Sequence, residues 1–233
     1  MQYLEFSDQI NLENQKVIGI DETGVGDYFT PLISCAFYLP NHLKDWALSI
    51  GVKDSKKLTD KKVIEIGQKL KANRDVRFSV YRLKQSTYNE MSKNYNAHEL
   101  KFFTHNGALN NLLKHEENTD FTLLIDKYTT TNSILKYDQK ILQWNNWANF
   151  KNFNFNTYLA HKAESIHLSV ACASIMARYE LIHFMQAQCR TWNFLFPLGS
   201  SKKTQEKVLE FEQRFGIEAL NQVCKTSFKK TKG

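Results

Sequence analysis

Short apolar runs and alternating positions along the chain predict a β-sheet. Two runs are continuously apolar, residues 16–20 (KVIGI) and 121–125 (FTLLI), as is typical of strands buried on both faces. Residues 32–39 (LISCAFYL) form another strand, which we expect to pair with the first as a long hairpin. Alternation over residues 76–81 and 153–159 indicates two half-buried strands. The pattern therefore predicts five strands.

Apolar residues at helical spacing fill the segments between these strands. Thr59 and Ser165 are placed to cap helices, and Asn96 with Glu99 three residues later is typical of a capping box. The predicted helices cover residues 60–71, a segment opening at Asn96, residues 166–189 and a segment running from Thr204 to Gly216. This order predicts an α/β fold with a mixed sheet, an antiparallel meander with parallel additions, covered by helices.

Composition narrows the class of protein. The 233 residues carry 31 Lys and Arg against 24 Asp and Glu, so the net charge of +7 favours a polyanionic partner. Cys35, Cys172, Cys189 and Cys224 have no zinc-site spacing, which indicates reduced thiols. The N-terminus does not have the pattern of a signal peptide, and no apolar run is long enough to span a membrane. We expect one cytoplasmic domain over residues 1–233.

Acidic residues follow two of the apolar strands. Asp21 and Glu22 come after VIGI, and Asp126 comes after TLLI. One acid at a strand end is commonly a turn former, but adjacent parallel strands would bring these carboxylates together at one edge of the sheet. Glu164, in Lys-Ala-Glu at a helix start, is either a first-turn residue stabilised by the helix dipole or a fourth acid of this cluster. Clustered carboxylates favour a hard cation, Mg²⁺ or Mn²⁺.

Two further segments have a composition suited to binding phosphates. The loop Thr23-Gly24-Val25-Gly26-Asp27-Tyr28 follows the first acid pair, and its glycines allow the backbone to approach a ligand. The same residues also occur in ordinary tight turns. Asp54-Ser55-Lys56-Lys57-Leu58 is either a solvated basic turn or a contact for a phosphate backbone.

Four ordered blocks resemble the type 2 ribonucleases H. They read IGIDETGVGDYFTPL, GVKDSKKLTDKK, TLLIDKY and HKAESIHLSVACASIMARY. The GDYF block, the Glu after Lys-Ala and the C-terminal FPLGSSKK and KTSFKKTKG segments are similar to ribonuclease HIII in particular. Thr23, Val25 and Thr30 depart from the residues frequent in that type.

The resemblance implies a ribonuclease H-like fold, a five-stranded mixed sheet flanked by helices. It also implies metal-dependent endonucleolytic cleavage of the RNA strand of RNA–DNA hybrids, leaving 5′-phosphate and 3′-hydroxyl ends. The catalytic and metal-binding residues carried over are Asp21, Glu22, Asp126 and Glu164, with Mg²⁺ or Mn²⁺ as cofactor. The nucleic-acid-binding residues expected are Thr23, Gly24, Val25, Gly26, Asp27, Tyr28, Ser55, Lys56, Lys57, Lys162 and Arg178.

The resemblance also sets expectations for the ends of the chain. Ribonucleases HIII typically carry an additional N-terminal substrate-binding domain, but only residues 1–15 precede the first predicted strand, so we expect a form without that domain. A hybrid duplex would then be gripped by a monomeric body and by a flexible basic tail over residues 225–233. The lysines of this tail are Lys225, Lys229, Lys230 and Lys232.

Three alternatives remain at the level of sequence. A ribonuclease HII would incise at a single embedded ribonucleotide, but Val25 stands where HII usually has Arg. A hybrid-binding module with a lapsed active site is disfavoured because all four acids are present. A junction resolvase on the same fold is disfavoured by the G-x-G-D-Y-F and D-S-K-K-L blocks.

Overall fold

A mixed sheet of six strands forms the centre of the molecule. The computed structural model describes residues 1–116 and 120–227. Within them the strand order is β1-β6-β5-β2-β3-β4. The strands are β1 (Gln2–Glu5), β2 (Val17–Thr23), β3 (Leu32–Tyr38), β4 (Arg77–Leu83), β5 (Thr122–Asp126) and β6 (Asn156–Ala160). The antiparallel meander β2-β3-β4 and the parallel additions β5 and β6 confirm the predicted topology.

The prediction of five strands was wrong by one. Strand β1 pairs in parallel with β6 at the edge of the sheet, with Tyr3 opposite Thr157. Its sequence is short and largely polar, and of its four residues only Tyr3 is buried. Edge strands are often very short, and four residues with one buried position give little hydrophobic signal.

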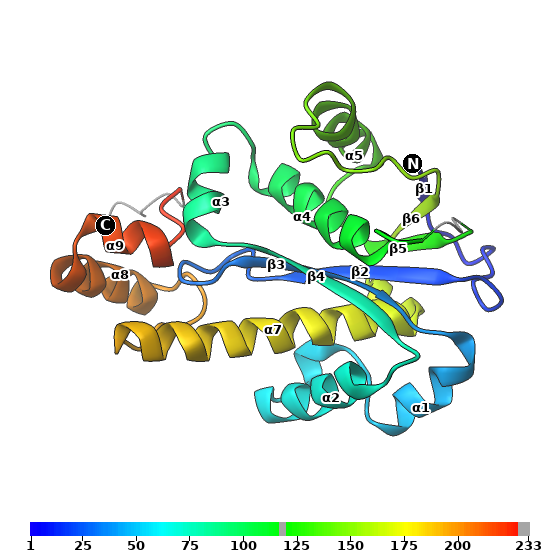
Figure 1. Cartoon of the computed structure of the whole chain (residues 1–233), viewed down its shortest axis with the longest axis horizontal. Coiled ribbons are helices and arrows are strands. Elements are labelled where there is room, and N and C mark those ends of the chain that lie inside the picture. The colour runs from blue at the N-terminus through cyan, green and yellow to red at the C-terminus, as the bar shows by residue number, and fades with distance from the viewer. Residues whose placement is uncertain (117–119, 228–233) are drawn as a thin grey trace.

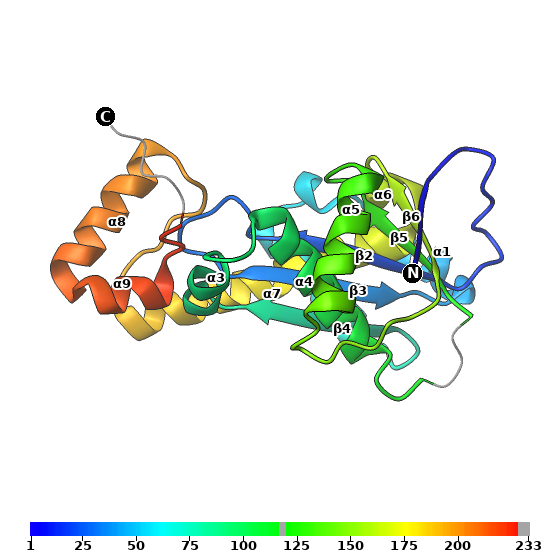
Figure 2. The ribbon, with the colours of Figure 1, turned by 90° about the horizontal axis from the view of Figure 1, so that it is seen from above.

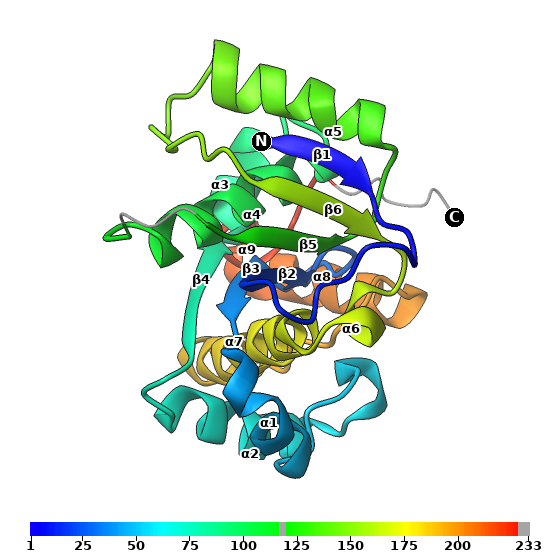
Figure 3. The ribbon, with the colours of Figure 1, turned by 90° about the vertical axis from the view of Figure 1, so that its right-hand side faces the viewer.

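Helices cover both faces of the sheet (Figures 1 and 3). On one face lie α3 (Gln85–Met91), α4 (Ala97–Leu112) and α5 (Thr131–Asp138), which continues into the π-helical turn Gln139–Trp144. On the other lies the long α7 (Leu168–Trp192), with α1 (Lys44–Ser49) and α2 (Asp60–Ala72) beyond it. The remaining helices are α6 (Ala163–Ile166), α8 (Lys202–Phe215) and α9 (Ile217–Val223). Figure 2 shows α8 and α9 at the opposite end of the molecule from β1.

The predicted helix starts are mostly confirmed. Thr59 caps α2, and Asn96 with Glu99 forms the capping box of α4. The predicted cap at Ser165 was wrong, because the chain makes the short α6 first and α7 then begins with His167 as its cap. The last predicted helix begins slightly earlier, at Lys202 with Ser201 as its N-cap, and ends at Phe215 with Gly216 as its C-cap.

The contact between β2 and α7 fixes the centre of the fold. A Cβ atom at Gly19 would lie 2.3 Å from the backbone nitrogen of Val170, so no larger residue fits there. The first turns of α7 are also small and buried (Ala171, Ala173). The helix therefore lies directly against the strand that carries the first pair of acids.

Candidate active site

Two of the four predicted acids meet at the C-terminal edge of neighbouring parallel strands. Ile20 of β2 is paired with Ile125 of β5, so Asp21 and Asp126 occupy the next position on each strand. The neighbouring strand β6 leads into α6, where the N–H of Ala163 donates to Oδ1 of Asp126 at 3.3 Å. Glu164 follows Ala163 in the first turn of that helix and is partly exposed. The topology thus brings all four acids to one edge.

Asp21 lies in a strongly negative environment. Burial raises the pKa of its carboxyl to about 7, and the charges of Glu22 and Asp126 act in the same direction. The Ser174 side chain and the N–H of Glu22, at 2.9 Å, donate hydrogen bonds that oppose this rise only in part. Without a cation, this carboxyl therefore tends to keep its proton near neutral pH.

Glu22 has the opposite environment. Its Oε1 pairs with Nζ of Lys101 at 2.7 Å, and its Oε2 lies 2.8 Å from Nε2 of His105. Burial acts to raise the pKa of Glu22, but the hydrogen bonds and charges of His105 and Lys101 outweigh it and lower the pKa to about 2. The ammonium of Lys101 also lies 4.3 Å from the ring centre of Tyr128. This carboxylate stays ionised and is held against α4.

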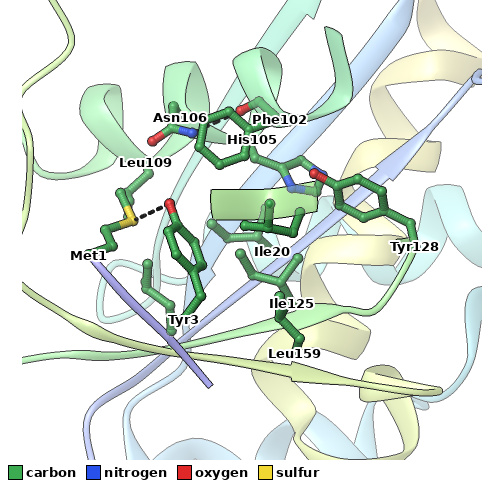
Figure 4. Close-up of a pocket in the computed structure, with 12 residues that line it drawn as sticks. Met1, Tyr3, Ile20, Phe102, His105, Asn106, Leu109, Ile125, Tyr128 and Leu159 are labelled. Atoms are coloured by element: carbon green, nitrogen blue, oxygen red, sulfur yellow. Dashed lines mark hydrogen bonds between the residues drawn. The ribbon is translucent and has the colours of Figure 1, made fainter. Parts of the chain in front are cut away.

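The small cavity lined by Ile20, His105 and Tyr128 is not a substrate site. Figure 4 shows it between the sheet and α4, with His105, Tyr128 and Ile20 around it and Tyr3 reaching toward Met1. Its volume is about 20 Å³, and most of its lining is apolar. A space of this size holds at most a water molecule. It is therefore too small to admit a nucleotide.

The loop after β2 is held by contacts with other parts of the protein. Gly24 has φ of 79°, and a Cβ atom there would lie 2.1 Å from the carbonyl oxygen of Pro31. Asp27 accepts a hydrogen bond from the N–H of Gly199, and its Oδ2 lies 3.3 Å from Oγ1 of Thr30. The Tyr28 side chain is buried, so the expected contact between this ring and nucleic acid is not available in this conformation.

The other loop residues differ in exposure. Thr23 ends β2 and is half-buried, Val25 packs partly against the apolar side chains under α4, and Gly26 is exposed. Gly26, unlike Gly24, has open space where a Cβ atom would be. The loop can therefore offer backbone groups rather than large side chains to a ligand.

The basic turn over residues 54–58 is tied to the same site. The hydroxyls of Ser55 and Ser174 lie 2.7 Å apart, which links the turn to the residue that donates to Asp21. Lys56 and Lys57 are exposed beside it. The turn therefore carries two solvent-facing cations at a fixed position relative to the acids.

Arg178 holds this turn instead of standing free for a phosphate. Its guanidinium donates to the carbonyl oxygens of Ser55 and Leu58 and pairs with Asp60 at 2.6 Å. Lys162 is exposed, with a left-handed φ of 54° immediately before α6. Of the two predicted cations on this side, only Lys162 points into solvent.

Lys225 was wrongly assigned to a flexible tail. Its side chain is fully buried, and its ammonium donates to the carbonyl oxygen of Gly24. Lys229, Lys230 and Lys232 lie outside the described residues. Lys225 therefore does not belong to an exposed basic tail.

Four residues of this region have roles that were not predicted from the sequence. They are Lys101, His105, Ser174 and Lys225. Lys101 and His105 stand four residues apart in a helix whose neighbouring positions are apolar, which indicates a buried polar pair on one helix face. Nothing local in the sequence marks Ser174 or Lys225.

The acids are not preassembled as a metal cage. Across residues 1–116 and 120–227, no three His, Cys, Asp or Glu side chains are grouped closely enough to hold an ion as they stand. Both oxygens of Glu22 already contact α4. Binding an ion would therefore require at least one carboxylate to turn toward it.

Known proteins are similar to this chain in sequence and in architecture. Residues 18–231 match the family model described as Ribonuclease HII. Ribonuclease HIII of Listeria monocytogenes serotype 4b is 32% identical over 226 residues, covering 95% of this chain and 69% of the relative. Ribonuclease HIII of Bacillus mycoides is also 32% identical, over 97% of this chain and 70% of its own length.

A solved structure shows the same fold. The crystal structure of Bst-RNase HIII in complex with Mn²⁺ superposes with a TM-score of 0.83 at 28% identity, covering 94% of this chain and 68% of that one. No helix within the described residues is long and apolar enough to cross a bilayer. The family match over nearly the whole chain and the similarity to these two relatives show that the chain belongs to the ribonuclease HII family and is of the ribonuclease HIII type.

Proposed function

We propose that this protein hydrolyses the RNA strand of RNA–DNA hybrids, using Mg²⁺ or Mn²⁺ held by Asp21, Glu22, Asp126 and Glu164. The observation that carries the proposal is the environment of Asp21, whose partly buried carboxyl lies beside the charges of Glu22 and Asp126. Such a concentration of negative charge is stable in its ionised form only when a cation neutralises it.

The donor set fits a hard divalent ion. All four side chains offer carboxylate oxygens, which Mg²⁺ and Mn²⁺ prefer over nitrogen or sulfur ligands. The relative of known structure was crystallised with Mn²⁺. When bound, a divalent ion at such a site lowers the pKa of a water and stabilises the leaving oxygen of a phosphodiester.

The residues at this edge of the sheet have different roles in the proposed site. Asp21 and Asp126 present oxygens from adjacent strand ends, and Ser174 orients the carboxylate of Asp21. Lys101 and His105 keep Glu22 ionised. Cleavage at such a site leaves a 5′-phosphate and a 3′-hydroxyl.

The surrounding loops supply contacts to the duplex. Lys56, Lys57 and Lys162 are exposed and are placed to contact phosphates, which position a duplex without reading its sequence. Ser55 and Arg178 serve the same surface indirectly, by holding the basic turn. The backbone of the loop from Thr23 to Tyr28 is suited to the 2′-hydroxyl, the group that separates RNA from DNA.

The chain forms one catalytic domain in this proposal, because a single sheet carries the site and both helical layers. We also propose that it acts as a monomer in the cytoplasm. Cys35, Cys172 and Cys189 carry free thiols, as is usual in a reducing compartment.

The test is Asp126→Asn, with Asp45→Asn as the matched control. Asp126→Asn should abolish hybrid cleavage in Mg²⁺ or Mn²⁺ while circular dichroism stays unchanged. Its thermal stability without metal should hold or rise, because one charge leaves a crowded cluster. Asp45, an exposed residue in the first turn of α1, should tolerate the same change. Cleavage by Asp126→Asn at the parent rate would overturn the assignment of the site.

The second function in view is incision at a single embedded ribonucleotide. The match to the family model described as Ribonuclease HII supports this second function. Val25 in the loop favours hybrid cleavage instead, since HII usually has Arg at this position. We expect efficient cutting of a hybrid with consecutive ribonucleotides, poor cutting of a duplex with one, and none of plain DNA. Equal cutting of the first two substrates would move the assignment to the HII type.

A further inference from the structure

Lys225 is a buried cation with no role in the chemistry described so far. Its side chain has 0% exposure, although a lysine is almost never fully buried unless its charge is satisfied. Two residues of α3 hold the segment around it. The Asn89 side chain accepts from the N–H of Thr226 at 2.9 Å and donates to the carbonyl of Cys224 at 2.8 Å. The Tyr88 ring lies 5.2 Å from the ammonium.

The ammonium of Lys225 is directed at the loop that follows the catalytic acids. It donates to the carbonyl oxygen of Gly24 and lies 3.2 Å from the carbonyl oxygen of Asp27 and 3.5 Å from Oγ1 of Thr30. The backbone N–H of Lys225 also donates to the carbonyl of Tyr28 at 2.8 Å. Burial lowers the pKa of this ammonium to about 8, against the opposing charge of Asp27. Three donors of one ammonium thus meet three oxygens of one loop.

This clamp determines which way the loop's peptide units face. The peptide bond between Gly24 and Val25 is trans, because the described residues contain no cis peptide bond. In a planar trans peptide the N–H points opposite to the C=O. Since the carbonyl of Gly24 points inward to Lys225, the N–H of Val25 points to the other side of the loop. Thr30 strengthens the arrangement by donating to the same carbonyl at 3.2 Å.

We infer that Lys225 is a positioning residue for substrate recognition, which holds the loop over residues 24–27 so that the amide of Val25 is presented to the 2′-hydroxyl of the RNA strand. The inference rests on the proposed function and deepens it. It assigns a role in RNA discrimination to a residue 201 positions away from the loop in sequence. Lys225 touches neither the acids nor the phosphate in this scheme and acts only through the loop.

The experiment compares binding of an RNA–DNA hybrid with binding of a DNA duplex of the same sequence. Both measurements use the full chain carrying Asp126→Asn, so that nothing is cleaved. Lys225→Met keeps the unbranched stem and removes the ammonium. We expect hybrid affinity to fall about tenfold, as for a lost charge-assisted hydrogen bond, while DNA affinity stays the same. The matched control is Lys69→Met, an exposed lysine on α2 paired with Glu65.

The two affinities separate the possible roles of Lys225. An equal fall in both would indicate a phosphate contact or a general loss of structure, since phosphate contacts do not depend on the sugar, and would overturn the inference. No change in either would overturn it as well. If the Asp126→Asn parent itself does not prefer the hybrid, the proposed function fails first.

A second variant keeps the inference testable if Lys225→Met does not fold, which thermal unfolding would show. Thr30→Val removes the hydroxyl that also holds the Gly24 carbonyl and keeps the side-chain volume. It should lower the preference for hybrid over DNA in the same direction and by less. An unchanged preference in Thr30→Val would then reject the role of the clamp.

Discussion

Asp21 and Glu22 are adjacent in sequence, but their pKa values are shifted in opposite directions because their side chains leave the strand on opposite faces. Successive residues of a strand alternate between the faces of the sheet. Asp21 faces α7, where Ser174 is its donor, and Glu22 faces α4, where Lys101 and His105 bind it. Burial and the charge of Glu22 raise the pKa of Asp21 to about 7 despite that donor, whereas His105 and Lys101 lower the pKa of Glu22 to about 2. One strand end thus carries two neighbouring carboxyls whose pKa values are shifted in opposite directions.

The sequence indicated the acids but not their partners. Asp21 and Glu22 could be found because they follow the apolar run of β2, and Asp126 because it follows the apolar run of β5. Lys101 is 79 positions from Glu22, and the pairing depends on how α4 lies across the sheet. Distances of that kind are set by packing between elements, which a periodic pattern does not encode.

Gly24 and Gly26 are a natural matched pair for testing the loop. Gly24→Ala should lower the free energy of unfolding by about 1–3 kcal/mol, because a side chain at positive φ is strained. It would also meet the carbonyl of Pro31. Gly26→Ala has open space and should leave the melting temperature unchanged. Thermal unfolding of both variants checks this, and equal melting temperatures would show that the loop does not need the conformation of Gly24.

At the scale of elements, regular patterns were predictable and short or interrupted ones were not. The strands β2, β3 and β5 and the capping box of α4 follow from apolar runs and cap residues. Strand β1 was missed because one buried tyrosine fixes it. The break between α6 and α7 was missed because a buried histidine is an uncommon cap.

His167 makes the start of α7 sensitive to acid. Its Nδ1 accepts from the N–H of Ser169 at 3.2 Å, which requires the neutral ring. Burial lowers the pKa of His167 to about 4, and the charge of Lys44 acts in the same direction. Between pH 6.5 and 4 the unfolded chain binds this proton and the folded chain does not. Stability is therefore lost as the pH falls through that window.

Replacing the histidine tests this dependence. His167→Asn keeps a capping acceptor that does not titrate in this range. We expect the parent to lose about 2 kcal/mol of unfolding free energy relative to His167→Asn between pH 7 and pH 4. Urea unfolding at both pH values measures the difference. His98→Asn, an exposed histidine on α4, is the control. Parallel pH profiles for parent and His167→Asn would contradict the prediction.

For the whole molecule, the surplus of seven positive charges sets how the protein holds a duplex. Each neutralised phosphate contributes about −0.9 to the slope of log K against log salt on a duplex. The expectation for the tail changes with the structure, because Lys225 is buried and leaves only Lys229, Lys230 and Lys232 to contact phosphates. Truncation tests of the tail must therefore start after it.

Deleting residues 228–233 should make that slope shallower while cleavage at low salt persists. The deletion removes three lysines, so the slope should change by up to about 2.7 if each contacts one phosphate. Binding is titrated across salt on the Asp126→Asn background. A chain with Lys62, Lys69 and Lys71 changed to Gln loses the same charge from α2 and serves as the control. An identical slope in the deleted chain would leave the tail without a role in binding.

The clamp of Lys225 on Gly24 also has a consequence for the time at which the enzyme becomes competent during its synthesis. The loop beside the first acids is translated early, but the residue that fixes it comes 201 positions later. Contacts so distant in sequence close late, because their loop-closure entropy must be overcome by the contacts already formed. On the role inferred above for Lys225, a nascent chain therefore carries Asp21 and Glu22 long before it can distinguish RNA from DNA, because Lys225 is translated only after α9.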